Sequence, residues 1–333
     1  MLKEPVTIFH LDLPLGTPFS TAGGTVGSRS VALVRMGSGP YGWGEAAPYP
    51  GQDESIEEVL LAARTGASTP TLKAALDEAS SDLRARVAGE SLAQIVGATL
   101  STVPVSIAVG LTDPLGEVER AVDLGVSRFK LKIEPGRVDH VAEVRRRHKE
   151  VVVGVDANGS FGPTTVHDLV PLADLGIAYL EQPVADLAAP EMSSMKWPVD
   201  VPVFADESVR SVSDAAVVLG LGHVDGVVVK PGRLGLSGAL VVTAMANASD
   251  KLWRASGLLE TGIGRAFNDI LAARPDAFVS DVAPAEWFLE RDVAASRNVE
   301  GSVVTPAGPG LGVEPNEDLL DQPWLKDWFD CAI

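Results

Sequence analysis

The chain has 333 residues, of which 46% are hydrophobic, and it carries a formal net charge of −18. This length allows one large domain or two modest ones. So acidic a composition argues against nucleic acid or an anionic membrane as a partner, because both attract basic patches. A small anionic molecule stays compatible with it, since a local site can oppose the overall field.

The compartment expected from the sequence is the cytoplasm. The single cysteine, Cys331, cannot form an internal disulfide, which suits a reducing environment. Residues 1–15 hold no apolar stretch of the signal-peptide type, and no run reaches the ~18 apolar residues of a membrane span. The pattern leaves open whether the protein is a monomer or a homo-oligomer.

Residues 1–48 are predicted to be β structure, with strands over 6–13 and 30–36 and another toward 41–48. Residues 18–30 between them are small, polar and glycine-rich. Thirteen residues is long for a hairpin connection, and long loops are more often functional. We therefore expect a mobile, substrate-facing lid here, with a plain hairpin connection as the alternative.

A helical pattern follows in three stretches, 53–66, 69–89 and 91–98. Strands followed by a run of helices favour a separate α+β capping domain over residues 1–100. The tail, 290–333, shows no further strand–helix unit and is rich in Pro and Gly. We expect it to return to the capping domain and complete it.

From Val103 onward, short apolar strands alternate with helical segments. The expected strands start near residues 105, 129, 152, 178, 203, 227, 253 and 278. Strands this rich in β-branched residues are typical of a parallel sheet that is buried on both faces. Eight units of about 25 residues predict an α/β fold with a (β/α)8 barrel over residues 101–289. A doubly wound open sheet is the alternative, although it would rarely carry eight units of such even length.

Five of these segments carry an ionisable residue at or near the end of the strand. The series runs 132→156→181→206→230, so the steps are 24, 25, 25 and 24 residues. Its members are Lys132, Asp156, Glu181, Asp206 and Lys230. Because the carboxyl ends of barrel strands share one face, these side chains are expected to form an arc around the mouth of the barrel.

The three carboxylates in the middle of the arc predict a metal site. Asp156, Glu181 and Asp206 would repel one another and raise one another's pKa without a cation between them. Oxygen ligands without His or Cys favour Mg²⁺ over zinc. At the third position Asp206 is preferred to its neighbour Glu207 because it lies nearer the strand.

The lysines predict acid–base chemistry. Lys130 and Lys132 are two residues apart on one strand, so they share a face, and we expect each to depress the pKa of the other. Lys230 ends a strand on the opposite side of the arc. A carboxylate substrate bound to Mg²⁺ between them would have a lysine at each face of its α-carbon, where a proton could be abstracted.

These motifs resemble those of the enolase superfamily, in particular its muconate-cycloisomerase-like subgroup. The similar segments are GWGEAAP (42–48), KLK (130–132), DAN (156–158), EQP (181–183), ADES (205–208) and KPGRLGL (230–236). The resemblance implies an α+β capping domain, a modified (β/α)7β barrel, and Mg²⁺ on Asp156, Glu181 and Asp206. It also implies that Lys132 and Lys230 form the acid–base pair.

Within the subgroup, the segments 255–265 and 288–292 are most similar to o-succinylbenzoate synthases. That resemblance implies a hydro-lyase that dehydrates 2-succinyl-6-hydroxy-2,4-cyclohexadiene-1-carboxylate in menaquinone biosynthesis. It makes Ser256 and Gly257, with the start of the following helix, candidates for binding the succinyl carboxylate.

Three further residues are candidate substrate contacts: Lys130, and Ser28 with Arg29 in the expected lid. An N-acylamino acid racemase is the alternative activity, alongside a cycloisomerase. A dipeptide epimerase is disfavoured because residues 279–287 lack that family's Asp-x-Asp. A barrel that only binds a ligand is also disfavoured, because it would need no flanking lysines.

Overall fold

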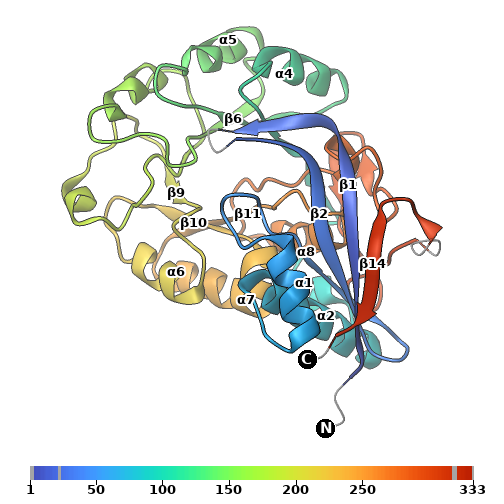
Figure 1. Cartoon of the computed structure of the whole chain (residues 1–333). Coiled ribbons are helices and arrows are strands. Elements are labelled where there is room, and N and C mark those ends of the chain that lie inside the picture. Colours follow the sequence, from blue (N-terminus) through green and yellow to red (C-terminus); the bar gives the residue numbers. More distant parts are fainter. Residues whose placement is uncertain (1–3, 22–23, 317–320, 332–333) are drawn as a thin grey trace.

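The N-terminal strands form an antiparallel sheet that a C-terminal strand completes. The computed structural model describes residues 4–21, 24–316 and 321–331. The sheet has the order β14-β1-β2-β3, and β14 lies antiparallel beside β1 (Figure 1). Its strands are β1 (Val6–Thr21), β2 (Gly24–Met36), β3 (Gly42–Ala46) and β14 (Leu325–Asp330). The C-terminal segment thus lies where a returning tail would be, while a domain boundary near residue 100 stays a prediction.

Helices α1 (Ile56–Thr65), α2 (Pro70–Ala88) and α3 (Leu92–Ile95) follow this sheet, within the three helical stretches that the sequence predicts. Ser55 and Glu58 form a reciprocal capping box at the start of α1. Helix α2 packs closely on β3, because glycines let the two backbones approach. A Cβ at Gly42 or Gly44 would lie 2.1 Å from a carbonyl oxygen of α2.

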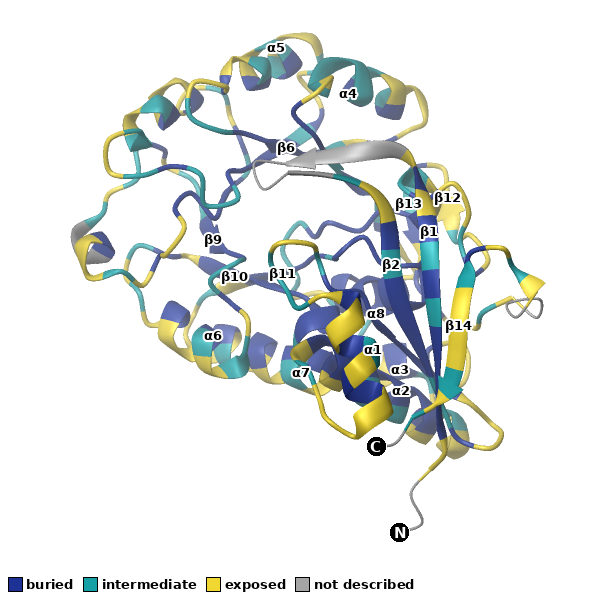
Figure 2. Cartoon of the chain, in the orientation of Figure 1, coloured by how far each residue is buried: buried dark blue, intermediate teal, exposed yellow. Residues whose placement is uncertain are grey.

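Seven parallel strands form the central sheet of the barrel, in the order β11-β10-β9-β8-β7-β6-β5. They are β5 (Ser106–Val109), β6 (Arg128–Lys132), β7 (Val152–Asp156), β8 (Leu180–Glu181), β9 (Val203–Ala205), β10 (Gly226–Val229) and β11 (Leu252–Ala255). Figure 2 shows these strands almost wholly buried inside a ring of helices whose outer faces are exposed. The unbroken order of neighbours confirms the barrel and excludes the doubly wound alternative.

Each of the seven strands is followed by a helical segment. These segments are α4 (Pro114–Asp123), α5 (Asp139–Arg147), η1 (Val166–Leu172), η2 (Pro190–Ser194), α6 (Val212–Leu219), α7 (Pro231–Ala248) and α8 (Gly262–Ala272). The third, η1, is a 3₁₀ helix where the sequence pattern predicts a longer helix over 163–176. Pro171 lies inside it and removes a backbone donor, which accounts for the short and irregular turn.

The eighth predicted strand is wrong in detail, because residues 278–282 form no regular strand. This segment nevertheless bridges the two edges of the sheet. On one side Phe278 and Asp281 donate backbone hydrogen bonds to Trp253 and Ala255 of β11, and on the other Ser106 of β5 donates to Val282. An irregular segment therefore closes the barrel after seven strand–helix units, in agreement with the (β/α)7β form.

The expected loop at 18–30 is corrected in its conformation, whereas its role as a substrate-facing lid stays a prediction. β1 and β2 pair as one long antiparallel hairpin, with Phe19 opposite Val26 and Thr21 opposite Gly24. Only residues 22 and 23 of the segment lie outside the described backbone. The hairpin is anchored further down, where Gly16 donates a backbone hydrogen bond to the carbonyl of Phe288.

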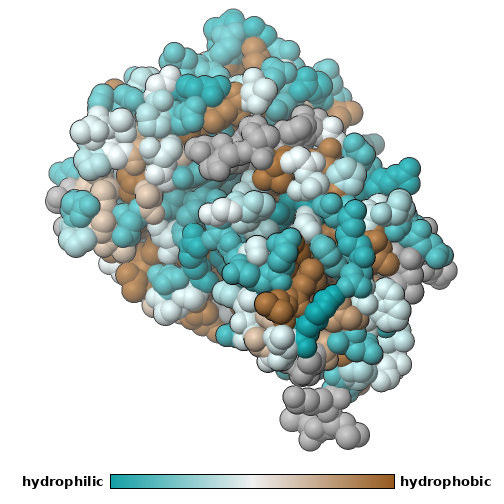
Figure 3. All heavy atoms as spheres, viewed as in Figure 1, coloured by the Kyte–Doolittle hydropathy of each residue, from teal (hydrophilic) through white to brown (hydrophobic). Residues whose placement is uncertain are grey.

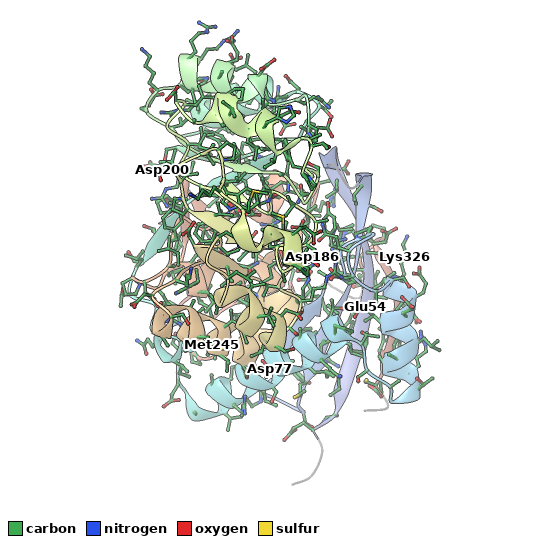
Figure 4. The ribbon with its side chains drawn as sticks, turned by 90° about the vertical axis from the view of Figure 1, so that its left-hand side faces the viewer. Glu54, Asp77, Asp186, Asp200, Met245 and Lys326 are labelled. Atoms are coloured by element: carbon green, nitrogen blue, oxygen red, sulfur yellow. The ribbon has the colours of Figure 1, made fainter. Side chains whose placement is uncertain are left out.

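The N-terminal part and the barrel share a polar seam as well as an apolar core. Asp77 of α2 accepts hydrogen bonds from the backbone and hydroxyl of Ser237 in α7, and Figure 4 shows Asp77 near that helix. Arg233 of α7 forms an ion pair with Asp53, at 3.0 Å.

A third, small sheet contains β12 (Asn298–Val299), β13 (Ser302–Val304) and β4 (Thr102–Pro104). Among the described residues, no helix is long and apolar enough to cross a membrane. The face seen in Figure 3 is mainly polar, with apolar residues interspersed among the polar ones.

Candidate active site

Strand register brings the predicted residues of the arc together. Lys132 of β6 lies opposite Asp156 of β7, which in turn lies opposite Glu181 of β8. Glu181 of β8 lies opposite Phe204 of β9, and Asp206 follows Phe204 by two residues along the chain. The backbone N–H of Asp206 donates to the side-chain oxygen of Gln182 at 2.8 Å, which ties the two strand ends together.

Each of the two outer lysines binds a carboxylate from a neighbouring strand. The ammonium of Lys132 lies 2.6 Å from Oδ2 of Asp156, and that of Lys230 lies 2.7 Å from Oδ2 of Asp206. Both lysines are less than one-tenth exposed. Their charged ends therefore face the interior of the barrel mouth, as the pattern predicts.

A second layer of charge lies beneath them. Lys130 contacts Glu181 at 2.5 Å, Asp281 at 2.7 Å and Asp156 at 3.1 Å. Arg254, which is fully buried, forms ion pairs with Glu181 and Asp281. The guanidinium also lies over the ring of Tyr179, 4.0 Å from its centroid. Glu181 is thus held between two cations.

The protonation states follow from burial and these contacts. Burial raises the pKa of Asp156, but the ammoniums of Lys132 and Lys130 outweigh burial and hold that pKa below its usual range. Burial raises the pKa of Glu181 to about 8, against the pull of Lys130 and Arg254. Burial lowers the pKa of Lys130, yet Asp281, Glu181 and Asp156 outweigh it and leave the pKa well above its usual value. The expectation that a neighbouring lysine depresses this pKa is therefore wrong for Lys130, because three carboxylates surround it.

A cavity opens above this cluster. Most of its lining comes from the carboxyl ends of the strands, and part from the N-terminal region and from the segment after the barrel. The residues that line it are Tyr49, Gln52, Ser106, Ala108, Lys130, Lys132, Asn158, Asp206, Glu207, Lys230, Ser256, Gly257, Leu258, Leu259, Arg265, Asp281, Ala283 and Phe288. A ligand in the cavity would meet cationic lysines on two sides and carboxylates between them.

Comparison with known proteins identifies the family. A family model described as "Enolase C-terminal domain-like" matches residues 115–319, which hold most of the barrel and all five residues of the arc. The chain belongs to the enolase superfamily.

Several superfamily relatives match along nearly the whole chain. An N-succinylamino acid racemase of Amycolatopsis sp is 32% identical over 97% of both chains. An o-succinylbenzoate synthase of Bacillus subtilis (strain 168) is 29% identical over 95% of both. Among solved structures, an enolase superfamily member from Listeria innocua superposes with a TM-score of 0.87 at 25% identity, covering 99% of this chain and 98% of the other.

The donor set at the mouth fits the divalent metal that is general in this superfamily. The buried cluster holds five carboxylates, those of Asp156, Glu181, Asp206, Glu207 and Asp281, against four cations, those of Lys130, Lys132, Lys230 and Arg254. The carboxylates thus outnumber the cations by one, and because burial raises the pKa of Glu181 to about 8, that group holds a proton near neutral pH. Oδ1 of Asp206 and Oε2 of Glu207 are buried without a hydrogen-bond partner among the described residues.

The carboxylates of Asp156, Glu181 and Asp206 do not converge on one point, as the prediction of a metal site would require. Within the described parts of the chain, no three His, Cys, Asp or Glu side chains are placed so as to hold a metal ion. Lysine ammoniums lie between the carboxylates instead. The oxygen chemistry and the excess of carboxylates over cations fit Mg²⁺, and a metal would compete with the lysines and with the proton of Glu181 for the same oxygens.

For the segment after β11, the structure agrees with one part of the expectation and corrects the other. Ser256 and Gly257 line the cavity, as predicted for substrate contacts. The start of α8 is not free to bind a carboxylate, because Glu45 accepts hydrogen bonds from the backbone N–H groups of Thr261 and Gly264. The N–H of Gly262 donates to Asp292. The helix terminus is therefore already satisfied by the protein's own carboxylates.

Two candidates on β2 do not line the cavity. Ser28 is exposed. Arg29 is only 1% exposed and is not among the residues that line the cavity. Its guanidinium donates to three backbone carbonyls, so the structure corrects its assignment as a direct substrate contact.

Sequence reasoning missed Arg254 and Asp281. A signal for Arg254 exists, because a charged residue two positions before Ser256 in an apolar strand shares its inward face. Residues 279–287 hold Asp281 without the second aspartate of an Asp-x-Asp motif. A lone Asp is weak evidence for a functional site. The partners of both residues depend on how the barrel closes, which spacing does not reveal.

Proposed function

We propose that this protein is an o-succinylbenzoate synthase that dehydrates 2-succinyl-6-hydroxy-2,4-cyclohexadiene-1-carboxylate to 2-succinylbenzoate, a step of menaquinone biosynthesis. The observation that carries the proposal is the placement of Lys132 and Lys230 on one cavity, at the ends of two strands, β6 and β10, that have three strands between them in the sheet. Relatives named o-succinylbenzoate synthase, at about 30% identity over nearly the whole chain, support it.

In this proposal Lys132 is the base, so the ammonium that is paired with Asp156 in the structure must first lose a proton to solvent. Its amine takes the proton from the carbon next to the substrate's carboxylate, and the C–H electrons are delocalised toward that carboxylate. The returning electrons form the ring double bond as the C–O bond breaks. Lys132 then gives its proton to the departing hydroxyl, which leaves as water, so that atoms and charge balance. Formation of the aromatic ring drives the reaction forward.

Lys230 has an electrostatic role in the same scheme. Its ammonium would lie beside the negative charge that develops on the substrate and would stabilise it. Asp206 lies 2.7 Å from the ammonium and holds it at the edge of the cavity. A bound Mg²⁺, held by Asp156, Glu181 and Asp206, would supply positive charge for the substrate carboxylate.

The test is an ultraviolet assay of 2-succinylbenzoate formation with Mg²⁺ and with EDTA. The expected result is product formation with Mg²⁺ that EDTA abolishes and added Mg²⁺ restores. A protein that forms no product at saturating Mg²⁺ would overturn the specific activity, while leaving its place in the superfamily intact.

A second candidate is N-succinylamino acid racemase. It is favoured by the same pair of lysines, because one on each side of a carbon could remove and return its proton from either face. Relatives with this name are 32% identical to the chain. Incubation of an N-succinyl-L-amino acid in D₂O distinguishes the two. Racemisation gives the deuterated D form as well as the L form, whereas a synthase without racemase activity gives no D form.

A further inference from the structure

Arg29 is a buried cation whose hydrogen bonds within the described residues go to backbone carbonyls, while the carboxylates of Glu260, Glu45 and Asp53 attract it without forming an ion pair. Its Nε, Nη1 and Nη2 donate to the carbonyl oxygens of Leu259, Pro48 and Ala47, at 3.4, 3.1 and 3.0 Å. The guanidinium carbon lies 5.5 Å from the ring centroid of Tyr49. No carboxylate of the described residues forms an ion pair with it. A buried charge is costly to keep. We therefore expect the guanidinium to have a structural role, which is to hold residues 47–48 against Leu259.

Each of those two segments contributes a wall of the cavity. Tyr49 reaches the cavity from the loop after β3, and Leu259 from the loop after β11. Leu259 has a φ of +59°, a conformation that a leucine seldom adopts without support. Its carbonyl accepts from Arg29, so the contact helps to hold this turn. Arg29 therefore links the N-terminal sheet to the barrel loop that carries the expected substrate contacts.

The Tyr49 wall is fixed from a second side. The backbone N–H of Tyr49 donates to Asp53 at 2.9 Å, and Asp53 is paired with Arg233 of α7. The hydroxyl of Tyr49 is buried and has no hydrogen-bond partner among the described residues. The side chain lines the cavity, and its hydroxyl has an unmet hydrogen bond that a polar group of a ligand could supply.

We propose that Arg29 is a positioning residue that fixes the Tyr49 and Leu259 walls of the cavity, and that the Tyr49 hydroxyl binds a polar group of the substrate. The substrate named for this site rests on the proposed function, whereas the positioning of the two walls does not. Lysine cannot replace Arg29, because a compact ammonium lacks the planar fork that reaches three carbonyls at once.

The test compares Arg29→Lys with Arg35→Lys. Arg35 lies on the same strand and also packs on a tyrosine ring, 4.7 Å from the centroid of Tyr41, but it does not line the cavity. Hydrogen–deuterium exchange of the intact protein is measured by mass spectrometry, together with KM and kcat in the dehydration assay. Tyr49→Phe, which removes only the hydroxyl, is a third variant.

Arg29→Lys is expected to speed exchange in residues 47–53 and 257–260 and to raise KM about tenfold, as the loss of one or two hydrogen bonds would. We expect kcat to change less than KM. Tyr49→Phe should raise KM by a similar factor while its exchange stays at the wild-type level. Arg35→Lys should leave KM and both segments unchanged.

Two results would overturn the inference: both segments exchanging alike in Arg29→Lys and Arg35→Lys, or faster exchange across the whole N-terminal sheet. An unchanged KM in Tyr49→Phe would overturn the role of the hydroxyl. If the wild-type protein does not turn over the proposed substrate but Arg29→Lys still loosens the two segments, the proposed function fails and the positioning role stands.

Discussion

Buried charge is handled in two different ways in this molecule. At the barrel mouth, charges neutralise one another side chain to side chain, as in the pairs of Lys132 with Asp156 and Lys230 with Asp206. At the seam between the N-terminal sheet and the barrel, apart from the ion pair of Arg233 with Asp53, buried ionisable side chains bind mainly backbone groups. Glu45 accepts from the backbone of Thr261 and Gly264, and Arg29 donates to three carbonyls.

The difference separates exchangeable contacts from fixed ones. An ion pair between two side chains can give up one partner to a metal or a substrate, because rotation about a few bonds suffices. A carboxylate bound to the start of a helix gives up its partners only if the helix moves. The mouth is therefore suited to binding and proton transfer, and the seam to holding the cavity walls in place.

The largest effect is expected at Lys132. Lys132→Ala removes the proposed base and should lower kcat in the dehydration assay by about 10²–10⁴-fold, the range for general acid–base catalysis. Stability should change much less, because Lys130 still contacts Asp156 at 3.1 Å. Lys149→Ala, an exposed lysine, is the control and should leave kcat unchanged. Undiminished turnover in Lys132→Ala would refute the mechanism.

Arg254 tests whether the ion pairs in the lower layer of the mouth cluster can exchange partners as readily as those of Lys132 and Lys230. Arg254→Met leaves Glu181 and Asp281 with Lys130 as their shared cation. Breaking a buried pair by removing one partner should lower the free energy of unfolding by about 3–5 kcal/mol in urea titrations at pH 8. Arg146→Met, which breaks an exposed contact with Glu143, should have no measurable effect. Equal stability of the two variants would show that Lys130 alone can neutralise Glu181 and Asp281.

The pH dependence of stability tests whether Glu45, one of the buried ionisable groups at the seam, is held in place as described. Burial raises the pKa of Glu45 to about 7, although hydrogen bonds from Thr261 and Gly264 act to lower it. The folded protein therefore holds the proton while the unfolded chain loses it near pH 4.5. The stability that this group contributes is complete below about pH 4.5 and is lost as the pH rises through 7, by about 3 kcal/mol at 1.4 kcal/mol per pH unit.

Glu45→Gln should flatten this decline in the free energy of unfolding between pH 4.5 and 7.5. Burial raises the pKa of Glu78 as well, so a residual slope of the same sign should persist in the variant. A slope equal to that of the wild type would show that Glu45 is ionised throughout, as the hydrogen bonds at the start of α8 would favour.

The same distinction explains what the sequence could and could not predict. The residues of the arc are set by strand ends, and parallel register places Lys132, Asp156 and Glu181 side by side. Contacts at the seam depend on how separate sheets meet, so the role of Arg29 could not be read from its position in a glycine-rich stretch. That stretch was predicted to be a loop because its composition disfavours strands, yet pairing along β1 makes it a hairpin.

The eighth barrel segment and Asp281 show the same limit. An apolar run near 278 predicts a strand, but the segment closes the barrel through only a few backbone bonds to β11 and β5. Because Asp281 gains Lys130 and Arg254 as partners only through that closure, no local pattern marks it.

The smallest effect, and the one that sharpens the comparison most, concerns Asp206 and Glu207. Both carry a buried oxygen without a partner among the described residues, so either could complete the metal site. Glu207 already accepts hydrogen bonds from Asn158 and Gln52, whereas the described partners of the Asp206 carboxylate reduce to Lys230. The exchangeable carboxylate is therefore Asp206. Asp206→Asn should weaken Mg²⁺ binding in calorimetric titrations by at least about tenfold, and Glu207→Gln by less. The reverse order would assign the metal to Glu207 and place Asp206 among the fixed charges.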